Sequence, residues 1–210
     1  MSIIQNISRR VFIKNMGLAS GGLILACNYT LFAKDIESGN LAEFNPNLFV
    51  QLNPDGSLII IASRSEMGNG VRTSLTSVVA DEMEADWNRV SIKQATGDAK
   101  YGDQNTDGSR SVTDFYETMR TMGAMARMML ITAAAKKWQV PESECKAQNH
   151  FIIHSSGKKL GYGELVDLVK TLPVPTTISY KDPKDFKYIG KTLKSIDVID
   201  FANGSAVFGI

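Results

Sequence analysis

The chain has 210 residues, of which 43% are hydrophobic and 21% are charged, and its formal net charge is +1. These values are typical of an ordinary globular protein of one or two domains, and the near-neutral charge excludes the strong basic field of a nucleic-acid-binding protein. The cysteines, Cys27 and Cys145, exclude a disulfide framework and a C-x-x-C metal site. Because His150 and His154 have no third ligand nearby, we expect structural or solvent-exposed roles for them.

Residues 1–33 have the features of an export signal. Arg9, Arg10 and Lys14 precede an apolar run over residues 16–26, which is shorter than the about 20 residues that cross a membrane. The order Ser-Arg-Arg-Val-Phe-Ile-Lys from residue 8 resembles the twin-arginine signal, in which Arg9 and Arg10 are read by the export machinery. That route carries folded proteins whose cofactors are inserted before export, so the segment predicts a periplasmic, cofactor-binding protein.

The fate of this segment is open at the level of sequence. Residues 24–27 resemble a lipoprotein processing box, in which Cys27 would carry the lipid. Alternatively, the segment is cleaved later, after Ala33, or is retained as an uncleaved membrane anchor. All three alternatives place the protein in the periplasm or at the periplasmic face of the inner membrane.

Residues 44–172 are predicted to form an α+β domain with a mixed sheet and packed helices. Strand-like runs at 48–52 and 58–62 flank a turn at 53–56, which predicts a hairpin. Apolar residues recur at helical spacing from Thr73, and residues 90–96 alternate as in a strand. The longest helix is predicted from Ser109 to about Trp138. Its methionine-rich face is expected in the core and consists of Phe115, Met119, Met122, Ala126, Met129, Leu130, Ala133 and Trp138.

After this helix we expect a strand, a turn at 155–159, a second short strand and a short helix over 163–172. From Pro173 the pattern loosens, and residues 206–210 form a strand-like run that ends abruptly. We therefore predict that residues 173–210 are a linker and the start of a following domain, and that the chain is a fragment of a longer protein.

Two polar loops each lead into a predicted helix. The first covers residues 66–70, and the second covers 97–108. The first N–H groups of a helix have no internal partner and the helix dipole is positive there, while glycines let a ligand approach the backbone. Such loops suit phosphates or a pterin ring. The alternative is that they are plain turns, with Asp107 or Ser109 as a helix N-cap; the G-x-G-x-x-G fingerprint and the P-loop lysine are absent.

Together, several stretches resemble the molybdopterin-binding large subunits of the xanthine dehydrogenase/aldehyde oxidase superfamily, especially the isoquinoline 1-oxidoreductase beta-subunit type. They are SEMGNGVRTSLTSVVADEMEADWNRV, GDAKYGDQNTDGSRSV, LGYGELV, FKYIGK and AVFGI. The resemblance implies an exported molybdenum hydroxylase with a molybdopterin cytosine dinucleotide cofactor and a [2Fe-2S] small subunit as partner. It also implies a small-molecule substrate, an N-heterocycle or an aldehyde.

The resemblance further implies which residues bind the cofactor. Residues 67–70 match the family's MGQG loop, with Asn69 where the family usually has Gln, and residues 108–111 match its GSRS loop. The implied binding residues are Met67, Gly68, Asn69, Gly70, Gly108, Ser109, Arg110 and Ser111.

The catalytic glutamate of the family lies near the far C-terminal end of a much longer chain. No catalytic residue or metal ligand is therefore assigned in these 210 residues, and Glu66 is not taken as the base. The chain is expected to be the N-terminal part of the large subunit and inactive on its own. The alternative is a standalone exported pterin- or anion-binding module without catalysis.

Overall fold

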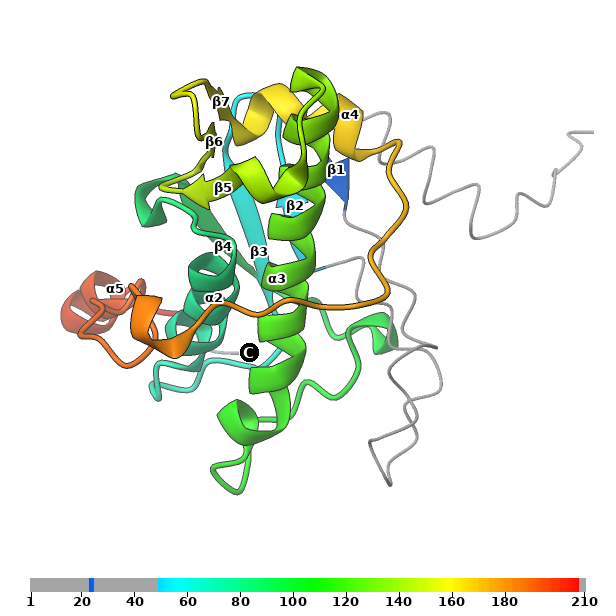
Figure 1. Ribbon diagram of the computed structural model, residues 1–210. Coiled ribbons are helices and arrows are strands. Elements are labelled where there is room, and N and C mark those ends of the chain that lie inside the picture. The colour runs from blue at the N-terminus through cyan, green and yellow to red at the C-terminus, as the bar shows by residue number, and fades with distance from the viewer. Residues whose placement is uncertain (1–22, 25–48, 208–210) are drawn as a thin grey trace, which may run out of the picture.

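The computed structural model describes residues 23–24 and 49–207. Arg9, Arg10 and Cys27 of the predicted export signal lie outside the described residues, whereas Leu23 and Ile24 of that segment form a strand of the first sheet. The domain has the predicted α+β architecture, in which two sheets are connected by a long helix (Figure 1). The first sheet has the order β1 (Leu23–Ile24), β2 (Val50–Leu52), β3 (Leu58–Ala62) and β4 (Val90–Gln94). Strands β2 and β3 form the predicted antiparallel hairpin, whereas β3 and β4 are parallel, so the sheet is mixed as expected.

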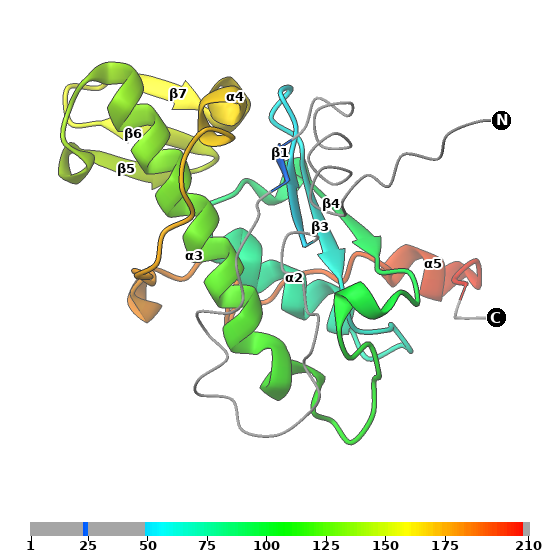
Figure 2. The same ribbon diagram turned by 90° about the vertical axis from the view of Figure 1, so that its right-hand side faces the viewer.

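Helix α2 (Val71–Glu82) is the crossover between the parallel strands β3 and β4, and it lies between the first sheet and the long helix (Figure 2). It begins two residues before the predicted start at Thr73. Most of its residues are buried, including the charged Asp81 and Glu82. The sequence pattern indicated an amphipathic helix, but α2 is covered on several sides because it is the middle layer.

Helix α3 (Ser111–Trp138) runs through the domain and packs along α2 (Figure 2). The predicted apolar face is buried, which confirms its role in the core, although Trp138 at the end of the helix is half-buried. Gly123 allows the two helices to approach closely, because a Cβ atom at this position would lie 2.6 Å from the carbonyl oxygen of Val79.

The second sheet lies at the C-terminal end of α3 and consists of β5 (Cys145–Gln148), β6 (Phe151–His154) and β7 (Lys159–Gly161) (Figure 2). The turn at 155–159 is confirmed. The run before it is a hairpin rather than one strand, because Asn149 and His150 adopt positive φ angles of 46° and 69° and reverse the chain. The helix predicted over 163–172 is shorter, with a 3₁₀ turn η6 (Tyr162–Leu165) followed by α4 (Val166–Val169).

Both histidines are buried and have local partners. His150 Nε2 lies 2.7 Å from the carbonyl oxygen of Gly56, so the second sheet is tied to the β2–β3 hairpin. Burial lowers the pKa of His150. His154 Nε2 lies 2.9 Å from the carboxylate of Glu144, and its Nδ1 lies 2.7 Å from the hydroxyl of Ser156. These contacts are structural.

The C-terminal segment contains the 3₁₀ turn η7 (Pro183–Asp185) and helix α5 (Val198–Asn203), and it packs against α2. The backbone N–H groups of Lys187, Tyr188 and Ile189 donate to the carboxylate of Asp81 at 3.0, 2.8 and 2.8 Å. Lys181 Nζ lies 2.7 Å from the same carboxylate. The predicted division of the chain at residue 173 stays a prediction.

The neighbouring carboxylate, that of Glu82, is shared with α3. Arg120 Nε and Arg127 Nη1 lie 2.7 and 3.0 Å from it.

The strand expected at 206–210 is not present at Ala206 and Val207, and residues 208–210 lie outside the described part. Further 3₁₀ turns are η3 (Trp87–Arg89), η4 (Ala99–Tyr101) and η5 (Glu142–Glu144). Within the described residues, no helix combines the length and the apolar character needed to cross a membrane.

Candidate functional site

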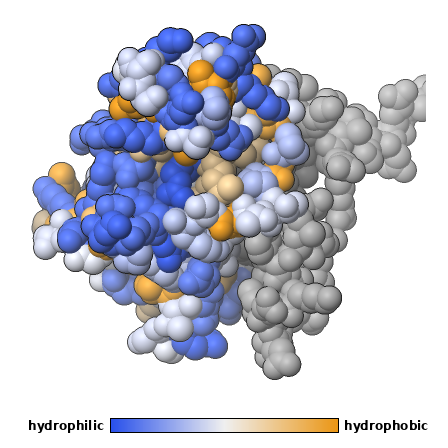
Figure 3. Space-filling model, in the orientation of Figure 1, coloured by the Kyte–Doolittle hydropathy of each residue, from blue (hydrophilic) through white to orange (hydrophobic). Residues whose placement is uncertain are grey.

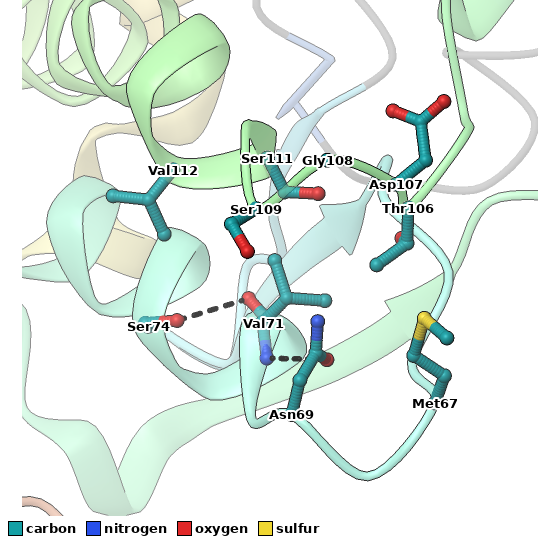
Figure 4. Close-up of a pocket in the computed structure, with 10 residues that line it drawn as sticks. All are labelled: Met67, Asn69, Val71, Ser74, Thr106, Asp107, Gly108, Ser109, Ser111 and Val112. Carbon is teal, nitrogen blue, oxygen red and sulfur yellow. Dashed lines mark hydrogen bonds between the residues drawn. The ribbon is translucent and has the colours of Figure 1, made fainter.

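The two predicted loops meet where α2 and α3 begin, and they line an open cavity of about 420 Å³ (Figure 4). The sequence separates the loops by some forty positions, and the fold brings them together at one cavity. The cavity is lined by Met67, Asn69, Val71, Ser74, Thr106, Asp107, Gly108, Ser109, Ser111 and Val112. Among the residues predicted to bind a cofactor, Gly68, Gly70 and Arg110 are not part of this lining.

The lining combines hydrogen-bonding side chains with apolar ones. Ser109 and Ser111 face Asn69 and Val71 from the opposite loop (Figure 4). Met67 is 63% exposed and is one of the apolar residues at the rim. A flat ligand with polar edges suits such a cavity, because the apolar groups contact its faces and the hydroxyl and amide groups bind its edges.

Glu66, to which the sequence analysis assigned no role, occupies the N-terminus of α2. Its Oε1 accepts hydrogen bonds from the backbone N–H groups of Gly68 and Gly70 at 2.8 and 2.9 Å, and its Oε2 accepts one from Arg72 at 3.1 Å. Burial raises the pKa of Glu66, but hydrogen bonds from Arg72, Gly70, Gly68 and Asn69 outweigh it and hold the pKa below its ordinary value. The amides that we expected to bind a ligand are therefore bound to the chain's own carboxylate.

One sequence signal could have identified this role. Glu66 directly precedes the glycine loop and a helix start, where a negative charge is favourable. The carboxylate also explains the need for glycines, since Gly68 and Gly70 adopt φ angles of 92° and 77° to wrap around it. A Cβ atom on either would meet nothing within 4 Å, so the backbone angle is the constraint, not crowding by the protein.

The N-terminus of α3 differs from that of α2. Its N-cap residue is Arg110 and no side chain caps it, so the prediction that Asp107 or Ser109 would be the cap is wrong. The chain reverses just before this N-cap, at Gly108 and Ser109, whose φ angles are 51° and 56°.

Among the described residues, the first backbone amides of α3 and the Ser111 hydroxyl have no hydrogen-bond partner. The backbone N–H groups of Ser111, Val112 and Thr113 find no acceptor among the described residues. Ser111 is 6% exposed, and its hydroxyl likewise has no hydrogen-bond partner there. Buried polar groups are almost always paired, so an unpaired hydroxyl in a cavity wall indicates a place for a ligand or water.

Arg110 was predicted to bind the cofactor, but it is not part of the cavity lining. Its Nη2 lies 2.8 Å from the carboxylate of Asp107, and its side chain is 60% exposed. This hydrogen bond and the charge of Arg110 lower the pKa of Asp107. The role of Arg110 in binding a cofactor stays a prediction.

Comparisons with known proteins point in one direction. A sequence model of the molybdopterin cofactor-binding domain matches residues 10–203. The chain is 26% identical to isoquinoline 1-oxidoreductase subunit beta of Brevundimonas diminuta, over 97% of this chain and 32% of that protein. It is 30% identical to the membrane-bound aldehyde dehydrogenase [pyrroloquinoline-quinone] of Gluconacetobacter polyoxogenes, over 80% of this chain and 22% of that protein. The chain thus spans a third or less of the length of these relatives.

Solved structures share the fold. Quinoline 2-oxidoreductase from Pseudomonas putida 86 superimposes with a TM-score of 0.50 at 18% identity, over 65% of this chain and 19% of that one. Reconstituted CO dehydrogenase from Oligotropha carboxidovorans gives a TM-score of 0.51 at 18% identity, over 66% and 18% of the two chains.

Proposed function

The chain belongs to the molybdopterin cofactor-binding domain family, within the xanthine dehydrogenase/aldehyde oxidase superfamily, and from that premise we propose that the cavity between the two loops holds part of a molybdopterin cofactor. The chain would then be the N-terminal part of an oxidoreductase large subunit. That the chain spans a third or less of the length of its relatives supports its being part of a longer subunit.

The observation that carries the proposal is the open N-terminus of α3. Ser111 offers a buried, unpartnered hydroxyl, and the amides of residues 111–113 have no acceptor among the described residues. The helix dipole favours an oxyanion at this end. Ser109 and Thr106 add hydroxyl groups to the same cavity. These groups fit a pterin or phosphate that carries several hydrogen-bond acceptors.

The chain's own residues would bind and orient the cofactor. Val71, Met67 and Val112 provide apolar contacts, while the hydroxyl groups select polar edges. Asn69 lines the cavity, but its Oδ1 also accepts a hydrogen bond from the N–H of Val71 at 3.4 Å, which leaves its amide nitrogen for a ligand. When bound, the cofactor supplies the redox-active molybdenum for hydroxylation of a carbon next to nitrogen or oxygen.

The finer assignments are part of the same proposal. We propose the cytosine dinucleotide form of the cofactor, a [2Fe-2S] small subunit as electron-transfer partner, and an N-heterocycle or an aldehyde as substrate. The family motifs in residues 67–70 and 108–111 support the cofactor. The names of the relatives, an isoquinoline oxidoreductase and an aldehyde dehydrogenase, support the substrate classes.

We also propose export through the twin-arginine route, supported by Arg9 and Arg10 in the segment Ser-Arg-Arg-Val-Phe-Ile-Lys. Replacing both arginines with lysine keeps the charge but removes the paired guanidinium groups. The double variant should accumulate in the cytoplasm, as measured by cell fractionation. Normal periplasmic accumulation of the double variant would contradict the proposal.

Ser111→Ala in the full-length enzyme tests the cofactor site. Loss of one hydrogen bond should weaken cofactor binding by about tenfold, which is measured as molybdenum and cytosine nucleotide per mole of enzyme after dialysis. Ser77→Ala is the matched control, because Ser77 is also 6% exposed but its hydroxyl is bonded to the carbonyl of Ser74 within α2. Ser111→Leu, which fills the cavity, should abolish binding; normal cofactor content in that variant would refute the site.

A further inference from the structure

Arg64 lies between the end of β3 and the first loop, and its side chain is only 3% exposed. Its Nη1 donates to the carboxylate of Asp103 at 3.2 Å and to the carbonyl of Asn105. Its Nη2 lies 3.5 Å from the carboxylate of Asp114 in the first turn of α3. The guanidinium carbon lies 4.2 Å from the centre of the Phe115 ring. The side chain of Arg64, just before the first loop, thus contacts both the second loop and the start of α3.

The residue after Arg64 reinforces this junction. The carbonyl of Ser65 accepts a hydrogen bond from the hydroxyl of Thr106 at 2.6 Å, and its N–H donates to the carbonyl of Gln104 at 3.4 Å. On the other side, the side-chain amide of Gln94 in β4 donates to the carbonyl of Arg64 at 3.1 Å. The base of the first loop is therefore fixed between β4 and the second loop.

The contacts of Arg64 need the geometry of arginine. A planar guanidinium can serve several acceptors in its plane while its face stacks on an aromatic ring, whereas a lysine ammonium is a single point charge. A buried cation is tolerated only when it is paired, so Arg64 holds its partners in place as much as they hold it. Its partner Asp103 in the second loop is 47% exposed, so the pair joins a buried cation to a loop at the surface.

We propose that Arg64 is a positioning residue that sets the distance between the two loops of the cavity and thereby its width. Met67 and Asn69 lie three and five residues after Arg64 along the chain, and Ser111 lies about one helical turn before Asp114. Both walls are thus anchored to one guanidinium that does not itself line the cavity. The expected effect of Arg64 on cofactor binding rests on the proposed function, whereas its contacts with the two loops do not.

Hydrogen–deuterium exchange of the ligand-free chain tests the proposal without any cofactor. In Arg64→Met, the backbone amides of residues 65–70 and 103–109 should exchange at least about tenfold faster, and both loops should change together. Arg64→Lys should show a smaller increase. Wild-type exchange in both loops of Arg64→Met would overturn the proposal.

Arg127→Met is the matched control. Arg127 is partly buried, with a side chain that is 12% exposed, and pairs with Glu82, but it lies roughly 24 Å along α3 from Ser111. The Arg127→Met variant should have a lower melting temperature but wild-type amide exchange in the two loops. Equally fast exchange in the loops of this control would overturn a specific role for Arg64. If Arg64→Met fails to fold, Arg64→Lys and Asp103→Asn decide by the same measurement.

The full-length enzyme separates this inference from the proposed function. Arg64→Lys should lower the molybdenum content after dialysis about tenfold, whereas Arg127→Met should retain it. If Ser111→Ala loses cofactor but Arg64→Lys, with loosened loops, does not, the positioning role is wrong and the cavity assignment stands. If cofactor content is normal in all these variants, the cavity assignment is wrong, and exchange alone decides whether Arg64 joins the loops.

Discussion

Helices α2 and α3 start at the same cavity, but the backbone amides at the start of α2 are hydrogen-bonded, whereas those of α3 are not paired within the described residues. At α2, the carboxylate of Glu66 binds the amides at the N-terminus, and the buried Asp81 and Glu82 near the C-terminus have several partners each. At α3, the first amides and the hydroxyl of Ser111 have no partner among the described residues. The start of α2 is thus capped by the chain's own carboxylate, whereas the start of α3 leaves donors unpaired where a ligand is expected.

The largest loss of stability should come from Asp81→Asn, which removes a buried negative charge near the C-terminal end of α2. The buried ammonium of Lys181 would lose one of two carboxylate partners, and three backbone N–H groups would face a neutral acceptor. Since opening a buried charged network is costly, we expect the free energy of unfolding in urea to fall by about 3 kcal/mol.

The control for this prediction lies in the same C-terminal segment. Asp182 pairs with Lys184, whose side chain is 74% exposed, and such surface pairs contribute little. Asp182→Asn should therefore change stability by less than about 0.5 kcal/mol. Equal losses in the two variants would show that the C-terminal segment does not depend on the buried carboxylate.

Glu66→Ala should have the next largest effect, because it opens the N-terminus of α2. The amides of Gly68, Gly70 and Arg72 would lose their acceptor, and we expect a loss of about 2 kcal/mol in urea unfolding. Glu66→Gln retains an acceptor without the charge and should lose about half as much. An unchanged stability of both variants would remove the contrast between the two helices.

The stability that Glu66 contributes at the start of α2 should depend on pH. The pKa of Glu66 lies below the ordinary value of 4.5, because hydrogen bonds from the loop amides outweigh the effect of burial. The stability that the carboxylate contributes is present above the ordinary pKa and is lost as the pH falls through the lowered pKa of the folded state. The amide NMR shifts of Gly68 and Gly70 should therefore titrate with a midpoint below 4.5; a midpoint above it would contradict the assigned hydrogen bonds.

The smallest changes in the free energy of unfolding are expected at two buried serines, Ser77 and Ser111. Ser77→Ala removes a hydroxyl that is bonded to the carbonyl of Ser74 at 2.8 Å, and it should lower the free energy of unfolding by about 1 kcal/mol. Ser111→Ala removes a hydroxyl without a partner among the described residues, so stability should stay within about 0.5 kcal/mol or rise slightly. If Ser111→Ala were the more destabilising variant in urea, its hydroxyl would be serving the fold rather than a ligand.

Local chemistry made much of the fold predictable. The turn at 53–56, the strands around it and the buried face of α3 depend on neighbours in the sequence, through turn residues and hydrophobic period. The two glycine and serine loops were found in the same way, and the fold brings them together at one cavity. Errors occurred where local signals were weak, as in the hairpin at Asn149 and His150.

Only the tertiary structure decided how the polar groups are paired. Asp81 is bound by residues about a hundred positions away, and Arg64 by residues some forty positions away, so no local pattern marks either as buried. Arg110 was expected at the cavity, but the reversal at Gly108 and Ser109 brings it to Asp107 instead. A periodic pattern records which face of an element is apolar. Which charge meets which donor depends on the packing of whole elements, because a buried ion is stable only where distant groups converge on it.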